Sequence, residues 1–132
     1  MSLRPFWRYY GGKWRIAPRY PSPTHGKIVE PFAGSAGYSL RHADLEVTLV
    51  EKYAELVEMW RWLIGSSAAD VMAVPCTDHL DSLPSSTPEG ARVLVGFMLG
   101  GALARPIKNL TAGSLKLREM GRKRIGWCEE HP

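Results

Sequence analysis

The sequence predicts an α/β fold in which a short parallel sheet is flanked by helices. Three observations predict it: a strand at 27–30 that leads into a turn of small residues, a second apolar strand at 46–50, and an amphipathic helix at 52–64. The order strand, glycine turn, helix, strand, helix is typical of the opening of a doubly wound α/β sheet.

The length and composition fit one small soluble domain. The chain has 132 residues, of which 45% are hydrophobic and 23% are charged. Arg4, Arg8, Lys13 and Arg15 interrupt the apolar runs at the N-terminus, so no signal peptide is expected. No apolar stretch reaches the roughly 20 residues that a membrane helix needs. We therefore expect a cytoplasmic protein with no membrane partner.

The N-terminal segment, residues 1–26, is dense in aromatic side chains and proline, and Gly11-Gly12 interrupts it. Glycine and proline in this density predict mostly loop, with a helical turn near 14–19. The strand at 27–30 follows this segment.

The turn at 31–37 is rich in glycine and alanine, and it leads into a short helix at 39–42. The second strand, at 46–50, is β-branched and apolar. This composition is typical of a parallel strand that is buried in a sheet.

The helix at 52–64 has its apolar residues at helical spacing, and Gly65 is expected to end it. These residues are Tyr53, Leu56, Val57, Trp60, Leu63 and Ile64. A short helix is expected at 68–74. A further helix is expected to begin with Thr87 as cap and Pro88 at its first position, and to continue through the apolar stretch 91–103.

The positive charge gathers at the two ends of a chain whose net charge is +4. Residues 105–124 hold seven lysines and arginines against one acid, Glu119. We expect two parts, a folded domain at 1–104 and a basic, irregular segment at 105–132. A nucleic-acid partner and a plain solvated basic surface both fit this charge pattern.

A candidate ligand site lies where the first strand meets the turn. Small residues around Gly34 and Gly37 allow a ligand to approach the backbone closely. Glu51 stands at the end of the second strand, where an acid can accept hydrogen bonds from the two hydroxyls of a ribose. Taken singly, the glycines fit an ordinary tight turn and Glu51 fits a helix N-terminal acid. Together they predict a site for a ligand that contains adenosine.

Three motifs in this order carry a resemblance to a known family. They are Tyr9-Tyr10-Gly11-Gly12-Lys13, then Val29-Glu30-Pro31-Phe32-Ala33-Gly34-Ser35-Ala36-Gly37, then Leu49-Val50-Glu51-Lys52. Over roughly the first 65 residues the chain resembles the amino-terminal half of DNA adenine-N6 methyltransferases of the Dam or D12 class, especially their phage and prophage members. The resemblance implies an incomplete Rossmann-like fold, S-adenosylmethionine as cofactor, and double-stranded DNA with a target adenine as partner.

The resemblance also implies roles for individual residues. Tyr9 and Lys13 would close over the methionine end of the cofactor, with Lys13 near its carboxylate, and Glu51 would hold the ribose. The loop under the cofactor would consist of Pro31, Phe32, Ala33, Gly34 and Gly37.

The chain departs from this family in one respect. The family transfers the methyl group with an Asp-Pro-Pro-Tyr tetrapeptide, and neither this motif nor a variant with Asn or Ser occurs in the sequence. We therefore expect no catalytic residue and a chain that is inactive alone, as from a truncated or frameshifted gene. A split enzyme with the rest on a second chain is the alternative. Separately, the incomplete sheet could pair with another copy of the chain in a homodimer.

Two other functions remain open at this point. The chain could be a non-catalytic remnant or subunit that binds S-adenosylmethionine or DNA. It could also be a plain nucleotide-binding module, although it lacks Gly-x-Gly-x-x-Gly.

The sequence contains two more clusters of polar residues. The basic run Arg122-Lys123-Arg124 is a candidate for phosphate contacts. Asp78, His79 and Asp81 are expected to be surface polar residues, and no metal site is expected.

Overall fold

The computed structural model describes residues 3–119. Its sheet consists of two parallel strands, β1 (Lys27–Pro31) and β2 (Glu46–Val50), paired from Lys27 opposite Glu46 to Pro31 opposite Val50. Both strands were predicted from the sequence, β2 with the bounds it has and β1 one residue shorter. The connection between the strands contains the small-residue turn and a 3₁₀ segment at Ser39–Arg41.

Four α-helices accompany the sheet in the described part of the chain. They are α1 (Ala54–Gly65), α2 (Ala68–Met72), α3 (Glu89–Met98) and α4 (Ala112–Glu119). The predicted helical turn in the N-terminal segment is present as two 3₁₀ segments, Lys13–Arg15 and Ala17–Arg19.

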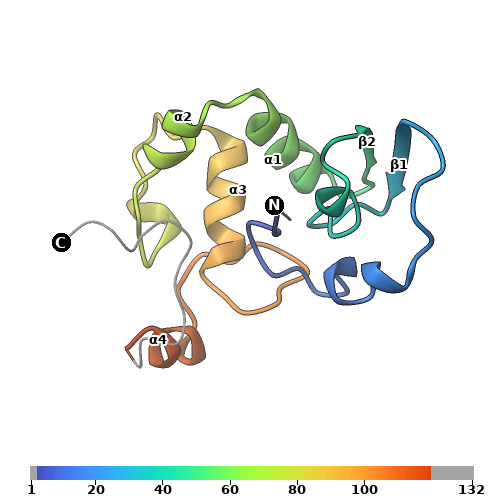
Figure 1. Cartoon of the computed structure of the whole chain (residues 1–132). Coiled ribbons are helices and arrows are strands. Elements are labelled where there is room, and N and C mark those ends of the chain that lie inside the picture. The colour runs from blue at the N-terminus through green and yellow to red at the C-terminus, as the bar shows by residue number, and fades with distance from the viewer. Residues whose placement is uncertain (1–2, 120–132) are drawn as a thin grey trace.

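The main core lies between α1 and α3. Figure 1 shows α1 between the two strands and α3, and these two helices pack against each other. Leu56 and Met59 of α1 and Leu94 of α3 are fully buried there. Trp7 completes this core from the N-terminal segment, with its ring 5.5 Å from that of Trp60.

A second, smaller core lies on another side of α3. Its buried residues are Val74, Leu83, Ala91, Val95 and Leu99, and Ile107 and Leu110 pack against it. Because Ile107 N–H donates to the carbonyl of Gly96 at 3.1 Å, the chain after α3 returns along that helix.

The sheet is less buried than the sequence predicted. The residues of β2 alternate between exposed and half-buried, and Val29 and Val50 are 63% and 48% exposed. Leu49 is half-buried against the main core. The expectation of a buried strand is therefore wrong, because an apolar composition does not show how many layers cover a sheet. Ile64, expected on the core face of α1, is 72% exposed.

Two predictions about α3 are also corrected. The helix has Pro88 as its N-cap, with no side-chain cap, because Pro88 is extended (ψ 144°) and the helix begins at Glu89. It ends at Met98 rather than continuing to Leu103, which forms a strand-like bridge with Tyr9. The pairing of Leu103 with Tyr9 and the low helix propensity of Gly100 and Gly101 both favour a helix that ends at Met98.

The segment after Arg105 is not irregular throughout, since α4 forms within it. Residues 107–111 also bond to the rest of the fold, with Leu80 N–H donating to Lys108 O at 2.8 Å and Leu110 N–H donating to Asp78 O at 2.8 Å. Within residues 3–119, none of the helices is long and apolar enough to span a membrane.

Candidate functional site

The candidate site lies at the carboxyl ends of both strands. Pro31 and Val50 are partners in the register, so the loop that follows β1 begins beside the end of β2. The N–H of Ala33 donates to the carbonyl of Val50 at 3.0 Å, which extends this pairing into the loop.

Glu51 connects the loop to the start of α1. Its Oε2 accepts the N–H of Gly34 at 2.9 Å, and its Oε1 accepts the N–H groups of Lys52 at 2.8 Å and Tyr53 at 3.1 Å. A carboxylate in this position satisfies free donors at a helix N-terminus and interacts favourably with the helix dipole. The predicted ribose acid is therefore fixed in place by three backbone groups.

The loop at 31–37 has an unusual backbone. Phe32 and Ala36 have positive φ angles of 51° and 53°, and Gly34 has 52°. Positive φ is uncommon for residues other than glycine, and such strain is concentrated at functional sites. The indole N–H of Trp60 donates to Gly34 O at 2.8 Å and so ties the loop to α1. Phe32 is 78% exposed, while Ala33 to Gly37 are buried.

The aromatic-Gly-Gly-Lys segment packs directly on this loop. A Cβ on Gly34 would lie 2.8 Å from the ring of Tyr9, and a Cβ on Gly37 would lie 2.4 Å from the backbone nitrogen of Trp14. Both positions therefore require glycine for contact within the fold. Gly37, predicted to approach the cofactor, lies against the N-terminal segment.

Lys13 lies between the first strand and the loop. Its Nζ is 3.2 Å from Oε1 of Glu30 and donates a hydrogen bond to the carbonyl of Phe32. Glu30 is 2% exposed, and its carboxylate also accepts the N–H groups of Tyr38 at 3.3 Å and Ser39 at 2.8 Å. A buried carboxylate is costly unless it is paired and hydrogen-bonded in this way.

Glu30 was not predicted as a site residue from the sequence. Its position at the end of a strand, beside the small-residue turn, was visible in the sequence. Nothing in the sequence pairs it with Lys13, because the two residues meet only after the N-terminal segment folds over the loop.

Two tyrosines beside Glu51 have raised pKa values. Burial raises the pKa of Tyr9, and the negative charge of Glu51 adds to this. Burial also raises the pKa of Tyr53 to about 12, together with the hydrogen bond to Glu55 and the charge of that carboxylate; the charge of Arg105 acts in the opposite direction.

The structure brings the predicted site residues together around one loop. These residues are Tyr9, Lys13, Pro31, Phe32, Ala33, Gly34, Gly37 and Glu51. The predicted phosphate contacts Arg122, Lys123 and Arg124 lie outside the described residues. Within residues 3–119, no group of three or more His, Cys, Asp or Glu side chains could hold a metal ion.

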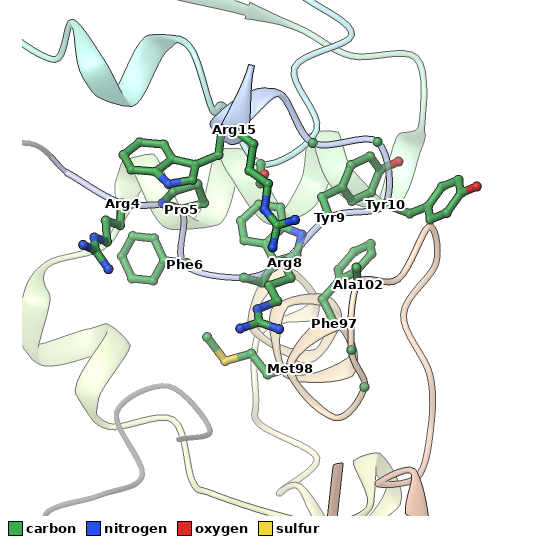
Figure 2. A pocket seen from close by; sticks show the side chains of 17 residues that line it. Arg4, Pro5, Phe6, Arg8, Tyr9, Tyr10, Arg15, Phe97, Met98 and Ala102 are labelled. Carbon is green, nitrogen blue, oxygen red and sulfur yellow. The ribbon is translucent and has the colours of Figure 1, made fainter. Parts of the chain in front are cut away.

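A pocket of about 690 Å³ lies next to this loop rather than over it. It is formed by the N-terminal segment, Ser35, the end of α3 and the glycines that follow α3 (Figure 2). Of the eight predicted site residues, Tyr9 alone lines it. The other seven predicted site residues do not line this pocket.

Comparisons with protein-family models, with curated proteins and with solved structures find no match for this chain.

Proposed function

We propose that this chain binds S-adenosylmethionine at the carboxyl ends of β1 and β2, as the cofactor-binding part of a DNA adenine-N6 methyltransferase with a Rossmann-like fold. One observation carries the proposal: Glu51 is hydrogen-bonded to the loop at Gly34, and Tyr9 and Lys13 pack on the same loop. Residues from three separate motifs therefore meet at the edge of the sheet where ligands of parallel α/β folds bind.

Glu51 fits the role of a ribose acceptor. A carboxylate can accept about four hydrogen bonds. Glu51 already accepts three from backbone N–H groups, two of them on Oε1. One acceptor position therefore stays open on Oε2, enough for one ribose hydroxyl. The three backbone bonds fix the orientation of the carboxylate before any ligand arrives, which reduces the entropy lost on binding.

Lys13 fits the role of a carboxylate partner. Its ammonium has three donors, and two of them go to Glu30 and to the carbonyl of Phe32. The third donor is left for the carboxylate of the cofactor. Because Glu30 offsets the charge of Lys13, the contact between Lys13 and the cofactor carboxylate acts mainly as a directed hydrogen bond and adds little net electrostatic attraction.

The exposed ring of Phe32 gives the ligand an apolar surface beside these polar groups. It is 78% exposed although its backbone is held in a strained conformation. Covering such a ring with the flat adenine of a cofactor removes apolar area from water, which is favourable.

The proposal covers binding and not transfer. A bound S-adenosylmethionine supplies a methyl group on a sulfonium, but these 132 residues contain no Asp-Pro-Pro-Tyr segment to present an adenine amine to it. The second function considered, a non-catalytic subunit that needs a partner chain, is favoured by the same observation.

Calorimetric titration with S-adenosylhomocysteine tests the proposal, with ATP and NAD as controls for general nucleotide binding. We expect saturable binding of S-adenosylhomocysteine and none of comparable strength for the controls. A sample that is folded by circular dichroism but does not bind S-adenosylhomocysteine contradicts the proposal. Equal binding of all three ligands would instead indicate a plain nucleotide-binding module.

A further inference from the structure

The pocket beside the cofactor loop is basic and aromatic. Arg4, Arg8 and Arg15 line it, and none of the described residues that line it is an aspartate or a glutamate. Figure 2 shows the side chains of Arg8 and Arg15 between Phe6 on one side and Tyr9 and Tyr10 on the other.

Within residues 3–119, the three arginines have no partner of opposite charge. None of them makes an ion pair or a side-chain hydrogen bond within the described part of the chain, where the ion pairs are Lys13–Glu30 and Lys27–Glu46. All three side chains are exposed. Guanidinium groups of like charge around one pocket repel one another, and an anion bound among them relieves this repulsion. Planar guanidinium groups bind phosphate oxygens especially well.

Two aromatic rings of this pocket, those of Phe6 and Tyr10, are available for stacking. Phe6 is 46% exposed and Tyr10 is 71% exposed, although both are large apolar side chains. Trp7 and Trp14 also line the pocket, and the buried indole N–H of Trp7 has no acceptor among residues 3–119.

We propose that this pocket holds a stretch of single-stranded nucleic acid, with its phosphates on Arg4, Arg8 and Arg15, one base on the ring of Phe6 and another on the ring of Tyr10. A groove with cationic side chains beside aromatic platforms is what single-strand binding requires. A duplex fits less well, because its bases are stacked on one another and their faces cannot reach these rings. The choice of nucleic acid, rather than another polyanion, rests on the proposed function, in which the double-stranded partner opens locally to present the target adenine.

The position of the pocket places such a strand next to the cofactor site. Tyr9 lines the pocket together with other residues of the N-terminal segment, and it also packs on Gly34 of the cofactor loop. Gly12 and Ser35 line the pocket too, and they lie against each other between the two sites. A single-stranded stretch held here would run alongside the cofactor loop.

The first test measures fluorescence anisotropy of a labelled single-stranded oligonucleotide over a range of salt concentrations. The variant carries Arg4→Gln, Arg8→Gln and Arg15→Gln. Each phosphate contact contributes about 0.7 to the slope of log affinity against log salt, so we expect the triple variant to lose a slope of about 2. Its affinity at low salt should fall as well.

The matched control carries Arg19→Gln, Arg61→Gln and Lys108→Gln, which remove the same charge from exposed residues outside the pocket. We expect the control to keep the slope of the unmodified chain. If the control loses as much slope as the pocket variant, the binding depends on net charge alone and the inference is wrong.

The second test concerns stacking. Phe6→Leu and Tyr10→Leu should each weaken single-strand binding by roughly 5- to 100-fold, as loss of a stacked base does. Tyr20→Leu, which removes a partly exposed tyrosine outside the pocket, should leave binding unchanged. Circular dichroism confirms that each variant is folded before binding is compared.

Two further outcomes overturn the inference: a duplex that binds as tightly as its separate strand, or full binding in both aromatic variants. Titration with S-adenosylhomocysteine separates this inference from the proposed function. If the chain binds S-adenosylhomocysteine but no oligonucleotide, the proposed cofactor site stands and the inference of a single-strand site is wrong. If the chain binds the oligonucleotide but not S-adenosylhomocysteine, the proposed cofactor site is wrong.

Discussion

The carboxylate of Glu51 accepts the backbone N–H of Gly34 at 2.9 Å and thereby joins the ends of the two strands. The same side chain bonds the first N–H groups of the segment that enters α1. A single residue thus fixes the loop, the end of β2 and the start of α1 relative to one another. Any ligand that contacts Glu51 meets a surface that is already ordered.

Replacing Glu51 should therefore weaken both the fold and the cofactor site. We expect Glu51→Ala to reduce the affinity for S-adenosylhomocysteine by about 1–3 kcal/mol, because it removes a charged acceptor. Calorimetric titration measures this, with Glu58→Ala as a control on the exposed face of α1. Lys13→Ala should have an effect of similar size. Unchanged affinity in both Glu51→Ala and Lys13→Ala would remove the basis for the site.

The ion pair between Lys13 and Glu30 should contribute far more to stability than the pair between Lys27 and Glu46. Glu30 is 2% exposed, whereas the side chains of Lys27 and Glu46 are 75% and 64% exposed. We expect Glu30→Gln to lower the free energy of unfolding by about 3 kcal/mol, because it leaves Lys13 and the donors of Tyr38 and Ser39 poorly satisfied. Lys27→Ala should lower it by less than about 1 kcal/mol.

Urea denaturation followed by tryptophan fluorescence measures both changes. Equal losses for the two variants would show that Glu30 is not held as tightly as its contacts indicate.

Gly37→Ala should destabilise the protein through a backbone clash. The added Cβ would lie 2.4 Å from the nitrogen of Trp14, and a backbone atom cannot rotate away as a side chain can. We expect a loss of about 1–3 kcal/mol, as for other overpacked sites. Gly65→Ala is the control, since a Cβ there meets nothing within 4 Å. Thermal melts of both variants give the comparison, and a Gly37→Ala melt equal to that of Gly65→Ala contradicts the packing.

Alkaline titration should detect the environment of Tyr53. Its pKa is raised to about 12, chiefly by burial, so its neutral form is favoured in the folded chain relative to the unfolded chain. Between pH 10 and 12 the unfolded chain binds fewer protons at this residue, so the stability that it contributes is complete below pH 10 and is lost as the pH rises towards 12.

The tyrosinate absorbance of the protein, compared with that of Tyr53→Phe, isolates this group. The difference should appear near pH 12. A difference that already appears at the ordinary pKa of an exposed tyrosine would show that Tyr53 lies in water.

Local patterns in the sequence were sufficient for most of the elements. A β-branched, apolar composition predicted β2, and helical spacing predicted α1. These patterns depend on residues close in the chain, so they can be read without the fold. The end of α3 could not be predicted in this way, because the backbone of Leu103 pairs with distant Tyr9. The helix α4 was missed because its sequence is polar and weakly periodic.

The sequence by itself determined two parallel strands, the small-residue turn between them and an acid at the end of the second strand. Only the tertiary structure decided that Glu30 holds Lys13, that Gly37 faces Trp14 and that three arginines surround one pocket. The physical reason is that strands and helices follow from local backbone preferences and periodicity. Ion pairs, close contacts and pockets form between segments that folding brings together, and no local pattern records those distances.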